Sequence, residues 1–258
     1  MCLIVFSYQS HPVYELIVAA NRDEFYERST QEAHFWENES HILAGKDLQA
    51  GGTWMGISKS GKFSALTNYR DLTTLKENPP SRGALVTDYL RTSDYTEKYL
   101  QNILPDAKAY NGFNLLLKDR TGFYHFSNHT MRTTPIEPGV HGVSNAVLDT
   151  PWNKLERAKA NLKKATSADY VDEEALFELL MDDTPAPDAD LPETGLTYEM
   201  EKLVSSIFIK SERYGTRCST LLLMDYKGNM KYVERRYDRD QNRISGTKSF
   251  ELEVTNQE

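Results

Sequence analysis

The sequence predicts an α+β protein built from two antiparallel sheets with helices on the outside. Strand-like apolar runs separated by short turns occupy both ends of the 258-residue chain, and a short turn between two such runs favours an antiparallel hairpin over a parallel βαβ unit. Amphipathic helical patterns fall between the two groups of strands. We find no repeat and no break that would separate two cores, so we expect one domain over residues 1–237 and a charged tail over residues 238–258.

The composition is that of an ordinary globular protein and excludes several classes of function. Hydrophobic residues make up 39% of the chain, and the net charge of −8 argues against nucleic-acid binding, which needs clustered Lys and Arg. Two cysteines are too few for a disulfide framework and indicate a reducing compartment. The N-terminus lacks a signal-like stretch, and no run approaches the roughly 18 to 20 apolar residues of a membrane helix. We therefore expect a cytoplasmic protein without a membrane span.

The first predicted strand covers residues 2–8 and begins with Cys2. If Met1 is removed, Cys2 carries both a thiol and a free α-amine, so that a nucleophile and a base share one residue at the end of a strand. A Met-Cys start is weak evidence by itself. The second predicted strand, residues 14–20, runs into the polar residues 21–24. Polar residues at the end of a buried strand need partners or a function; alternatively, they cap the following segment and pair among themselves.

The middle of the chain predicts two more hairpins and two helices. Residues 51–58 and 63–69 form one hairpin and residues 113–117 and 123–126 the other. Between these hairpins, we expect a loop over residues 72–81. Ser81 can cap a helix that runs to about residue 92, and a second helix is expected to end before Pro105.

The last third predicts two further helices and three strands. Thr150 as cap with Pro151 at the first helical position predicts a helix start, and Asp172 can cap the next helix. Residues 182–195 are acidic and proline-rich and predict an exposed loop. The predicted strands cover residues 205–209, 216–226 and 230–236.

Polar side chains recur at or just beyond the ends of the predicted strands. In a sandwich, several strand ends can converge on one edge, and acyl transfer from an N-terminal cysteine needs amides for the oxyanion, a cation beside the thiol and a carboxylate for the α-ammonium. Convergence on such a pocket is our hypothesis. The recurring groups are residues 21–24, residues 68–70, Asn145 and Arg217.

Nine segments together resemble the NRDE family, whose animal members are called transport and Golgi organization protein 2. The resemblance runs in the family's order from residue 1 to about residue 237. The family resembles N-terminal nucleophile hydrolases, which implies a four-layer αββα sandwich. The segments are Met1-Cys2, Asn21-Arg22-Asp23-Glu24-Phe25, Gly51-Gly52-Thr53-Trp54, Leu66-Thr67-Asn68-Tyr69-Arg70, Ser81-Arg82-Gly83, Asn111-Gly112-Phe113-Asn114, Ser144-Asn145-Ala146, Asp149-Thr150-Pro151-Trp152 and Tyr214-Gly215-Thr216-Arg217.

The resemblance implies a site similar to that of the bile-salt and penicillin V acylases. Cys2 matches the nucleophile of those acylases. Asn68 lies in a segment that resembles the one carrying an asparagine of their oxyanion hole. Asn145 lies in a segment that resembles the one carrying their second polar contact. Those acylases carry Arg-x-x-Asp where this chain has adjacent Arg22 and Asp23, so the carboxylate that faces the α-amine is either Asp23 or Glu24. The candidate catalytic residues are Cys2, Arg22, Asp23, Asn68, Asn145 and Arg217, and the candidate substrate-binding or supporting residues are Asn21, Glu24, Trp54, Tyr69 and Arg70.

On this interpretation the chain is a hydrolase that cleaves an amide or thioester and forms an acyl-enzyme on Cys2. Its expected ligand is a small acyl compound, and no metal or cofactor is expected. The alternative is a carrier of haem, lipid or acyl-CoA on an inactive form of the same fold, because the resembling family is associated with haem and lipid handling. Cys2, the histidines and the methionines would then be the available iron ligands. The chain has no Cys-x-x-Cys-His for covalent haem attachment. The sequence leaves the substrate and the oligomeric state open.

Overall fold

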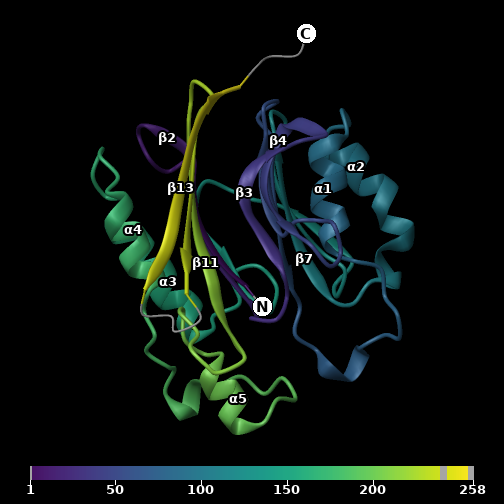
Figure 1. Cartoon of the computed structure of the whole chain (residues 1–258), viewed down its shortest axis with the longest axis vertical. Helices are drawn as coiled ribbons and strands as arrows, with labels where there is room; N and C mark the ends of the chain where they lie inside the picture. The colour runs from purple at the N-terminus through teal and green to yellow at the C-terminus, as the bar shows by residue number, and fades with distance from the viewer. Residues whose placement is uncertain (1, 239–242, 255–258) are drawn as a thin grey trace. The chain divides into compact units, whose positions relative to one another are not determined.

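The computed structural model describes residues 2–238 and 243–254. The chain forms two compact units, each built around one sheet: unit 1 comprises Met1–Glu27 and Glu137–Leu252, and unit 2 comprises Arg28–Ile136 and Glu253–Glu258. Every strand pairing described is antiparallel, which confirms the predicted α+β class with two antiparallel sheets and helices (Figure 1). The single domain ending at residue 237 stays a prediction.

The sheet of unit 1 has six strands in the order β10-β1-β2-β11-β12-β13. The N-terminal hairpin β1–β2 therefore lies at its centre, with β10 on one side and the C-terminal strands on the other. All seven residues of β1 are buried, strands of the same sheet flank it on both sides, and Leu3 and Val5 pack in one core with residues of α3. The strands are β1 (Cys2–Tyr8), β2 (Tyr14–Phe25), β10 (Gly139–Val143), β11 (Tyr214–Asp225), β12 (Asn229–Tyr237) and β13 (Ile244–Glu253).

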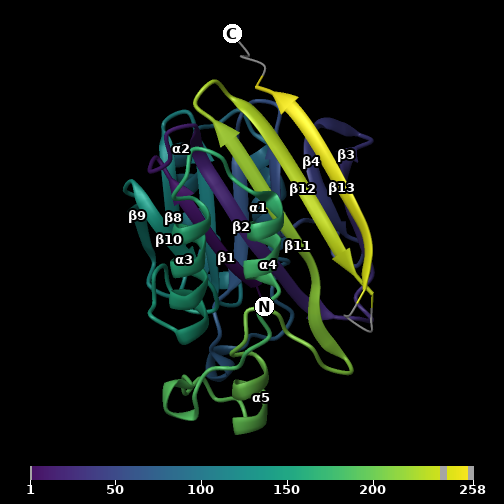
Figure 2. The ribbon, with the colours of Figure 1, turned by 90° about the vertical axis from the view of Figure 1, so that its left-hand side faces the viewer.

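Two helices, α3 (Asn153–Ala165) and α4 (Glu173–Leu180), lie across one face of this sheet (Figure 2). Leu155 and Leu162 recur at helical spacing on α3 and pack with apolar residues of β1, β2 and β11 in one core. Asp172 caps α4 as predicted, since its side chain accepts from the N–H of Glu174. The remaining helical segments of unit 1 are η3 (Asp188–Asp190) and α5 (Tyr198–Leu203).

The sheet of unit 2 has seven strands in sequence order, β3 to β9. Helices α1 and α2 supply residues such as Tyr89 and Tyr99 to a core with one face of this sheet. The strands are β3 (Thr30–Trp36), β4 (Glu39–Asp47), β5 (Met55–Ser58), β6 (Phe63–Asn68), β7 (Phe113–Asp119), β8 (Gly122–Ser127) and β9 (Arg132–Pro135). The helices are η1 (Leu72–Thr74), α1 (Gly83–Arg91), α2 (Thr96–Ile103) and η2 (Leu104–Ala109).

Three expectations about strands are wrong. Residues 21–24 continue β2 instead of following its end, because β11 is equally long and its polar residues Thr216 and Ser219 bond to the polar residues of β2. Arg217, which was expected at or just beyond a strand end, likewise lies within β11. Residues 205–209 are not a strand: their polar groups bond outside any sheet ladder, for example the N–H of Phe208 to the carbonyl of Asp182.

Two other differences concern helix starts and the tail. Helix α3 begins at Asn153 with Trp152 as its cap position, because the hydroxyl of Thr150 bonds to the carbonyl of Val147 and so belongs to the preceding turn. The tail expected after residue 237 contains strand β13, while residues 239–242 and 255–258 lie outside the described part. Strands β3 and β4 were not predicted. In the described residues, no helix combines the length and the apolar character required to cross a bilayer.

Candidate functional site

Cys2 stands at the start of β1, directly opposite Arg22 of β2. Cys218 of β11 is paired with the same arginine from the other side. Directly opposed residues of neighbouring strands project from the same face of a sheet. The three side chains therefore form a row across three strands, with the guanidinium between two buried, free thiols.

Burial sets the chemical state of Cys2. The residue is only 8% exposed, and burial raises the pKa of its thiol. The charge of Asp23 raises this pKa further, whereas the charge of Arg22 and a hydrogen bond from the backbone N–H of Asp23 lower it. The local structure thus favours the protonated thiol but already provides two groups that stabilise a thiolate. A thiolate at this position needs a base that accepts the proton.

Successive residues of β2 point to opposite faces of the sheet, and this separates the two acidic candidates. The Glu24 carboxylate lies 3.8 Å from the Arg22 guanidinium, in a loose ion pair on the face that carries Cys2. Asp23 points to the face covered by the helices, where its Oδ1 accepts from the Thr216 hydroxyl at 2.7 Å. Burial raises the pKa of Asp23 to about 6, against the lowering effect of the nearby Lys154 and Arg22 charges.

Asn21 belongs to the scaffold of the site. Its side chain is fully buried, and its amide nitrogen donates to the carbonyls of Leu180 and Ile207 at 2.8 and 2.9 Å. Its Oδ1 accepts from the Ser219 hydroxyl at 2.6 Å. All of these bonds join β2 to other elements of unit 1, so Asn21 fixes the strand that carries Arg22 and Asp23.

The segment after β10 brings Ser144 and Asn145 to Cys2. Strand β10 pairs with β1 along Ile4 to Tyr8, and the Ser144 hydroxyl donates to the carbonyl of Cys2 at 3.1 Å. The same hydroxyl lies 3.3 Å from Oδ1 of Asn145, whose side chain is buried. The structure therefore brings Asn145 together with Cys2, Arg22 and Asp23 in unit 1.

Arg217 contacts the end of β2. It is the extra residue of a β-bulge between Thr216 and Cys218. Its guanidinium donates to the carbonyl of Phe25 at 2.8 Å and lies over the ring of Tyr26. Burial lowers the pKa of Arg217, and the charge of Arg22 lowers it further. These contacts give Arg217 a part in holding β2, and its catalytic role stays a prediction.

Four further residues of the site were missed by sequence reasoning: Ser144, Lys154, Thr216 and Tyr214. Lys154, in the first turn of α3, is 3% exposed and donates to the carbonyl of Val204 at 2.9 Å. Burial raises the pKa of Tyr214 strongly, and the neighbouring charges of Asp23 and Cys2 add to the effect. Ser144 and Thr216 stand beside predicted site residues in the sequence, which was a usable signal. Lys154 carries no such signal, because a lysine in an amphipathic helix is normally exposed.

The other candidates belong to unit 2 and gather at one end of its strands β5 and β6. Asn68 is the last residue of β6, and Tyr69 and Arg70 follow it. The carbonyl of Trp54, the residue before β5, accepts from the N–H of Leu66 at 2.7 Å. The Tyr69 ring stacks on His129 with centroids 3.9 Å apart, and burial followed by the charge of Asp71 raises the pKa of Tyr69. The roles of these four residues at Cys2 stay predictions.

In residues 2–238 and 243–254, no group of three or more His, Cys, Asp or Glu side chains is arranged to hold a metal ion. Several histidines have structural partners in their own unit. His11 bonds through Nε2 to the carbonyl of Ala168, and His125 bonds to Asn114.

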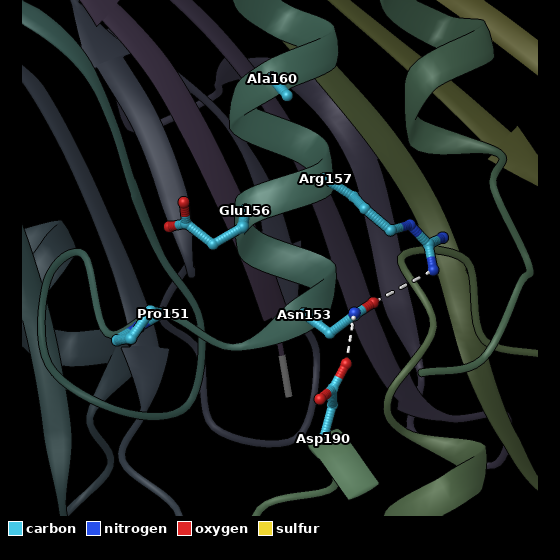
Figure 3. A pocket seen from close by; sticks show the side chains of 6 residues that line it. All are labelled: Pro151, Asn153, Glu156, Arg157, Ala160 and Asp190. Carbon is cyan, nitrogen blue, oxygen red and sulfur yellow. Dashed lines mark hydrogen bonds between the residues drawn. The ribbon is translucent and has the colours of Figure 1, made fainter. Parts of the chain in front are cut away.

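A surface groove of about 520 Å³ lies along α3 (Figure 3). Its polar side chains bond to one another: the amide of Asn153 donates to Asp190 at 3.1 Å, and Arg157 donates to Asn153 at 3.4 Å. The lining contains no thiol and no histidine; it consists of Pro151, Asn153, Glu156, Arg157, Ala160 and Asp190. The groove therefore offers no nucleophile, and Cys2 remains the centre of the candidate site.

The comparison with solved structures gives a second view of the fold. The structure of the mutant C2A conjugated bile acid hydrolase from Clostridium perfringens matches with a TM-score of 0.51 and 10% identity, covering 99% of this chain and 98% of that one. At this identity the match shows the fold alone. It places the chain in the fold of the N-terminal nucleophile hydrolases, as the sequence resemblance implied.

The comparison with curated sequences is more specific. The transport and Golgi organization 2 homolog of Mus musculus is 34% identical over 258 residues, and the human homolog is 35% identical over 256 residues. Each alignment covers 91% of this chain and 92% of the relative. The family model described as Transport and Golgi organisation 2 matches residues 1–239. The chain belongs to the Transport and Golgi organisation 2 family.

Proposed function

We propose that this protein is an N-terminal cysteine hydrolase that cleaves an amide or thioester through an acyl-enzyme on Cys2. One observation carries the proposal: on a fold shared with N-terminal nucleophile hydrolases, the thiol at the start of β1 lies opposite Arg22, next to the backbone N–H of Asp23. A thiol placed only for packing does not need a buried cation directly across the strand pair, since a charge is costly to bury.

The proposed chemistry requires that Cys2 heads the mature chain. Its α-amine then takes the proton of the thiol, and the resulting thiolate attacks the carbonyl carbon of the substrate. A C–S bond forms while the carbonyl electron pair moves to oxygen, where Asn145, Asn68 and backbone N–H groups would hold the oxyanion.

The acyl-enzyme forms when the tetrahedral intermediate collapses and the bond to the leaving group breaks. The leaving nitrogen or sulfur takes the proton from the α-ammonium. Water then adds to the thioester, the α-amine accepts a proton of that water, and collapse releases the carboxylic acid and the Cys2 thiol. The charges support this cycle: Arg22 favours the thiolate, and Asp23, when ionised, favours the α-ammonium.

The comparisons support the reaction class. The neighbour from Clostridium perfringens is named as a hydrolase of conjugated bile acids, and a fold that supports hydrolysis there can support it here. Fold similarity alone does not define the substrate. We accordingly propose only the acyl class of the substrate.

Intact-protein mass spectrometry tests the proposal. The purified chain is incubated with a panel of N-acyl amides and acyl thioesters, and the spectrum reports the removal of Met1 and any acyl adduct together. We expect an adduct on the chain that begins with Cys2, no adduct after Cys2→Ala, and an unchanged adduct after Cys218→Ala. The Cys218→Ala variant is the matched control because Cys218 is equally buried and faces the same arginine.

A haem titration tests the carrier alternative on the same preparations. A saturable Soret shift that disappears in Cys2→Ala, in a chain that forms no acyl adduct, would contradict the hydrolase proposal. Acyl adducts and turnover that survive Cys2→Ala would contradict it as well.

A further inference from the structure

Asp149 closes the loop that carries Ser144 and Asn145. Its backbone N–H donates to the carbonyl of Gly142 at 2.8 Å, and its Oδ1 accepts from the N–H of Gly142 at 3.0 Å. Gly142 itself is fixed on β10, where it pairs with Val5 of β1. The chain therefore leaves β10, passes Ser144 and Asn145, and is tied back to the strand it left.

The backbone of Asp149 is held in an unfavourable conformation. Its φ of +56° lies in the left-handed region, which is unfavourable for a residue with a side chain, although Asp and Asn tolerate it best. Gly142, opposite Asp149 in the loop closure, has no room for a side chain, because a Cβ there would lie 2.7 Å from Cδ1 of Leu155. Both ends of the loop are thus determined by close contacts.

The Asp149 carboxylate also accepts from two cations. Its Oδ2 lies 2.7 Å from Nδ1 of His141, and its Oδ1 lies 2.9 Å from Nζ of Lys159 on α3. The other ring nitrogen of His141, Nε2, lies 2.9 Å from the carbonyl oxygen of Glu137. A carbonyl and an ionised carboxylate only accept, so both ring nitrogens must donate, and this geometry requires the imidazolium form of His141.

The charges around His141 agree with this geometry. The hydrogen bond to Asp149 raises the pKa of His141 against the opposing effects of burial and of Lys159. Burial alone would raise the pKa of Asp149, but the bonds from His141 and Lys159 lower it. The charged groups that face the imidazole are the Asp149 carboxylate and the Lys159 ammonium, and Glu156 lies 3.2 Å from that ammonium. From β1, the uncharged ring of Phe6 lies against the imidazole.

The contacts of His141 and Asp149 reach the strand pair of β1 and β10, and β1 begins with Cys2. His141 pairs with Phe6 in the register of β10 and β1. The loop held by Asp149 carries the hydroxyl of Ser144, which donates to the carbonyl of Cys2 at 3.1 Å, and the buried Asn145. The pair of His141 and Asp149 stands level with Phe6, four residues along β1 from Cys2, and it can influence the surroundings of Cys2 through this loop.

We propose that Asp149 and His141 are positioning residues that lock the Ser144–Asn145 loop onto Cys2, and that loss of a proton from His141 loosens this lock. The consequence at Cys2 rests on the proposed function; the lock itself does not. Because His141 gains a partner on folding, its contribution is complete below its ordinary pKa of about 6.5 and is lost as the pH rises through its raised pKa. Lys159 keeps its charge in this range and retains part of the loop closure.

The experiment uses the full chain, two test variants and one control variant. Asp149→Asn keeps the shape of the side chain and tolerates a positive φ but removes the charge. His141→Gln removes the titrating group. Glu156→Gln is the matched control, because it changes a carboxylate that contacts Lys159 and leaves Asp149 and His141 in place. The readouts are the imidazole chemical shifts of His141, hydrogen exchange of residues 142–149 corrected for intrinsic rates, and the rate of acyl-adduct formation at Cys2.

In the wild-type chain we expect His141 to titrate above its ordinary pKa of about 6.5. The protection of residues 142–149 from hydrogen exchange should fall as His141 loses its proton. Asp149→Asn and His141→Gln should each lower this protection about tenfold at about pH 6, below the ordinary pKa of histidine, while Glu156→Gln leaves it unchanged. A wild-type His141 that titrates at its ordinary value, with equal loop protection on both sides of that titration, would overturn the lock without reference to any variant.

The two proposals fail separately. If no chain forms an acyl adduct but loop protection follows His141 as expected, the hydrolase is wrong and the lock stands. If acyl adducts form at equal rates in wild type, Asp149→Asn and His141→Gln, the hydrolase stands and the positioning role is wrong.

Discussion

Arg22 of β2 lies directly opposite Cys2 of β1, and on its other side it is paired with Cys218 of β11. Burial raises the pKa of both thiols, and the charge of Arg22 counteracts this rise at each of them. One buried guanidinium thus lowers the pKa of two thiols that stand at different positions in the chain. Only Cys2 stands where removal of Met1 would place an amine on the same residue.

Replacing Arg22 with Met should slow the reaction of Cys2 with iodoacetamide at neutral pH. Loss of the cation raises the thiol pKa further, and one unit of pKa corresponds to about a tenfold loss of thiolate. Peptide mapping after timed alkylation separates Cys2 from Cys218. Arg236→Met is the control, since Arg236 lies opposite Cys218 and not opposite Cys2. Equal alkylation of Cys2 in wild type and Arg22→Met would show that the guanidinium does not influence the thiol.

Asp23→Asn should flatten the dependence of stability on pH. Because burial raises the pKa of Asp23 to about 6 in the folded chain, the folded state holds this proton more tightly than the unfolded state does. The protonated form of Asp23 contributes its full stability below pH 3.8, the pKa of the carboxyl in the unfolded chain. This contribution is lost as the pH rises through about 6, its pKa in the folded chain. The loss is on the order of 3 kcal/mol.

Denaturant unfolding at a series of pH values measures this effect as the difference between wild type and Asp23→Asn. Asn retains an oxygen for the Thr216 hydroxyl. Asp225→Asn serves as the comparison, because turn hydrogen bonds outweigh burial and lower the pKa of Asp225. Its replacement should alter the profile only at lower pH. Parallel profiles for wild type and Asp23→Asn would be inconsistent with a raised pKa at Asp23.

Asn21→Ala should destabilise unit 1 by about 2–4 kcal/mol, since two buried carbonyls and the Ser219 hydroxyl each lose a partner. The midpoint of thermal or denaturant unfolding measures the change. Asn102→Ala is the matched control, because the Asn102 amide bonds to Asp94 at an exposed position and its removal should stay within about 0.5 kcal/mol. A similar small effect for both substitutions would contradict the scaffold role of Asn21.

Asn68→Ala should slow acyl-adduct formation at Cys2 by about 100-fold to 1,000-fold if its amide holds the oxyanion. Alkylation of the same thiol by iodoacetamide builds no oxyanion and should keep its rate, which makes it an internal control in the same variant. Equal slowing of both reactions would point to a disturbed thiol. An unchanged acylation rate would remove Asn68 from the mechanism.

The sequence located the elements that depend on local pattern. The apolar runs of β1, β6, β7 and β11 and the Asp172 cap of α4 follow from hydrophobic periodicity and capping, which act between neighbouring residues. The extension of β2 through residues 21–25 could not be found in this way. Its polar residues look like a strand end until Thr216 and Ser219, nearly 200 positions later, supply their partners.

The sequence by itself determined the α+β class, the family resemblance and the residue types available for acyl transfer, because these depend on composition, spacing and motif order. Only the tertiary structure decided which of those residues meet. Strand register places Arg22 beside Cys2, pleating sends Asp23 and Glu24 to opposite faces, and α3 brings the buried Lys154 into electrostatic reach of Asp23. Such contacts join residues that are far apart in the chain, and no local pattern encodes the pairing of one strand with another.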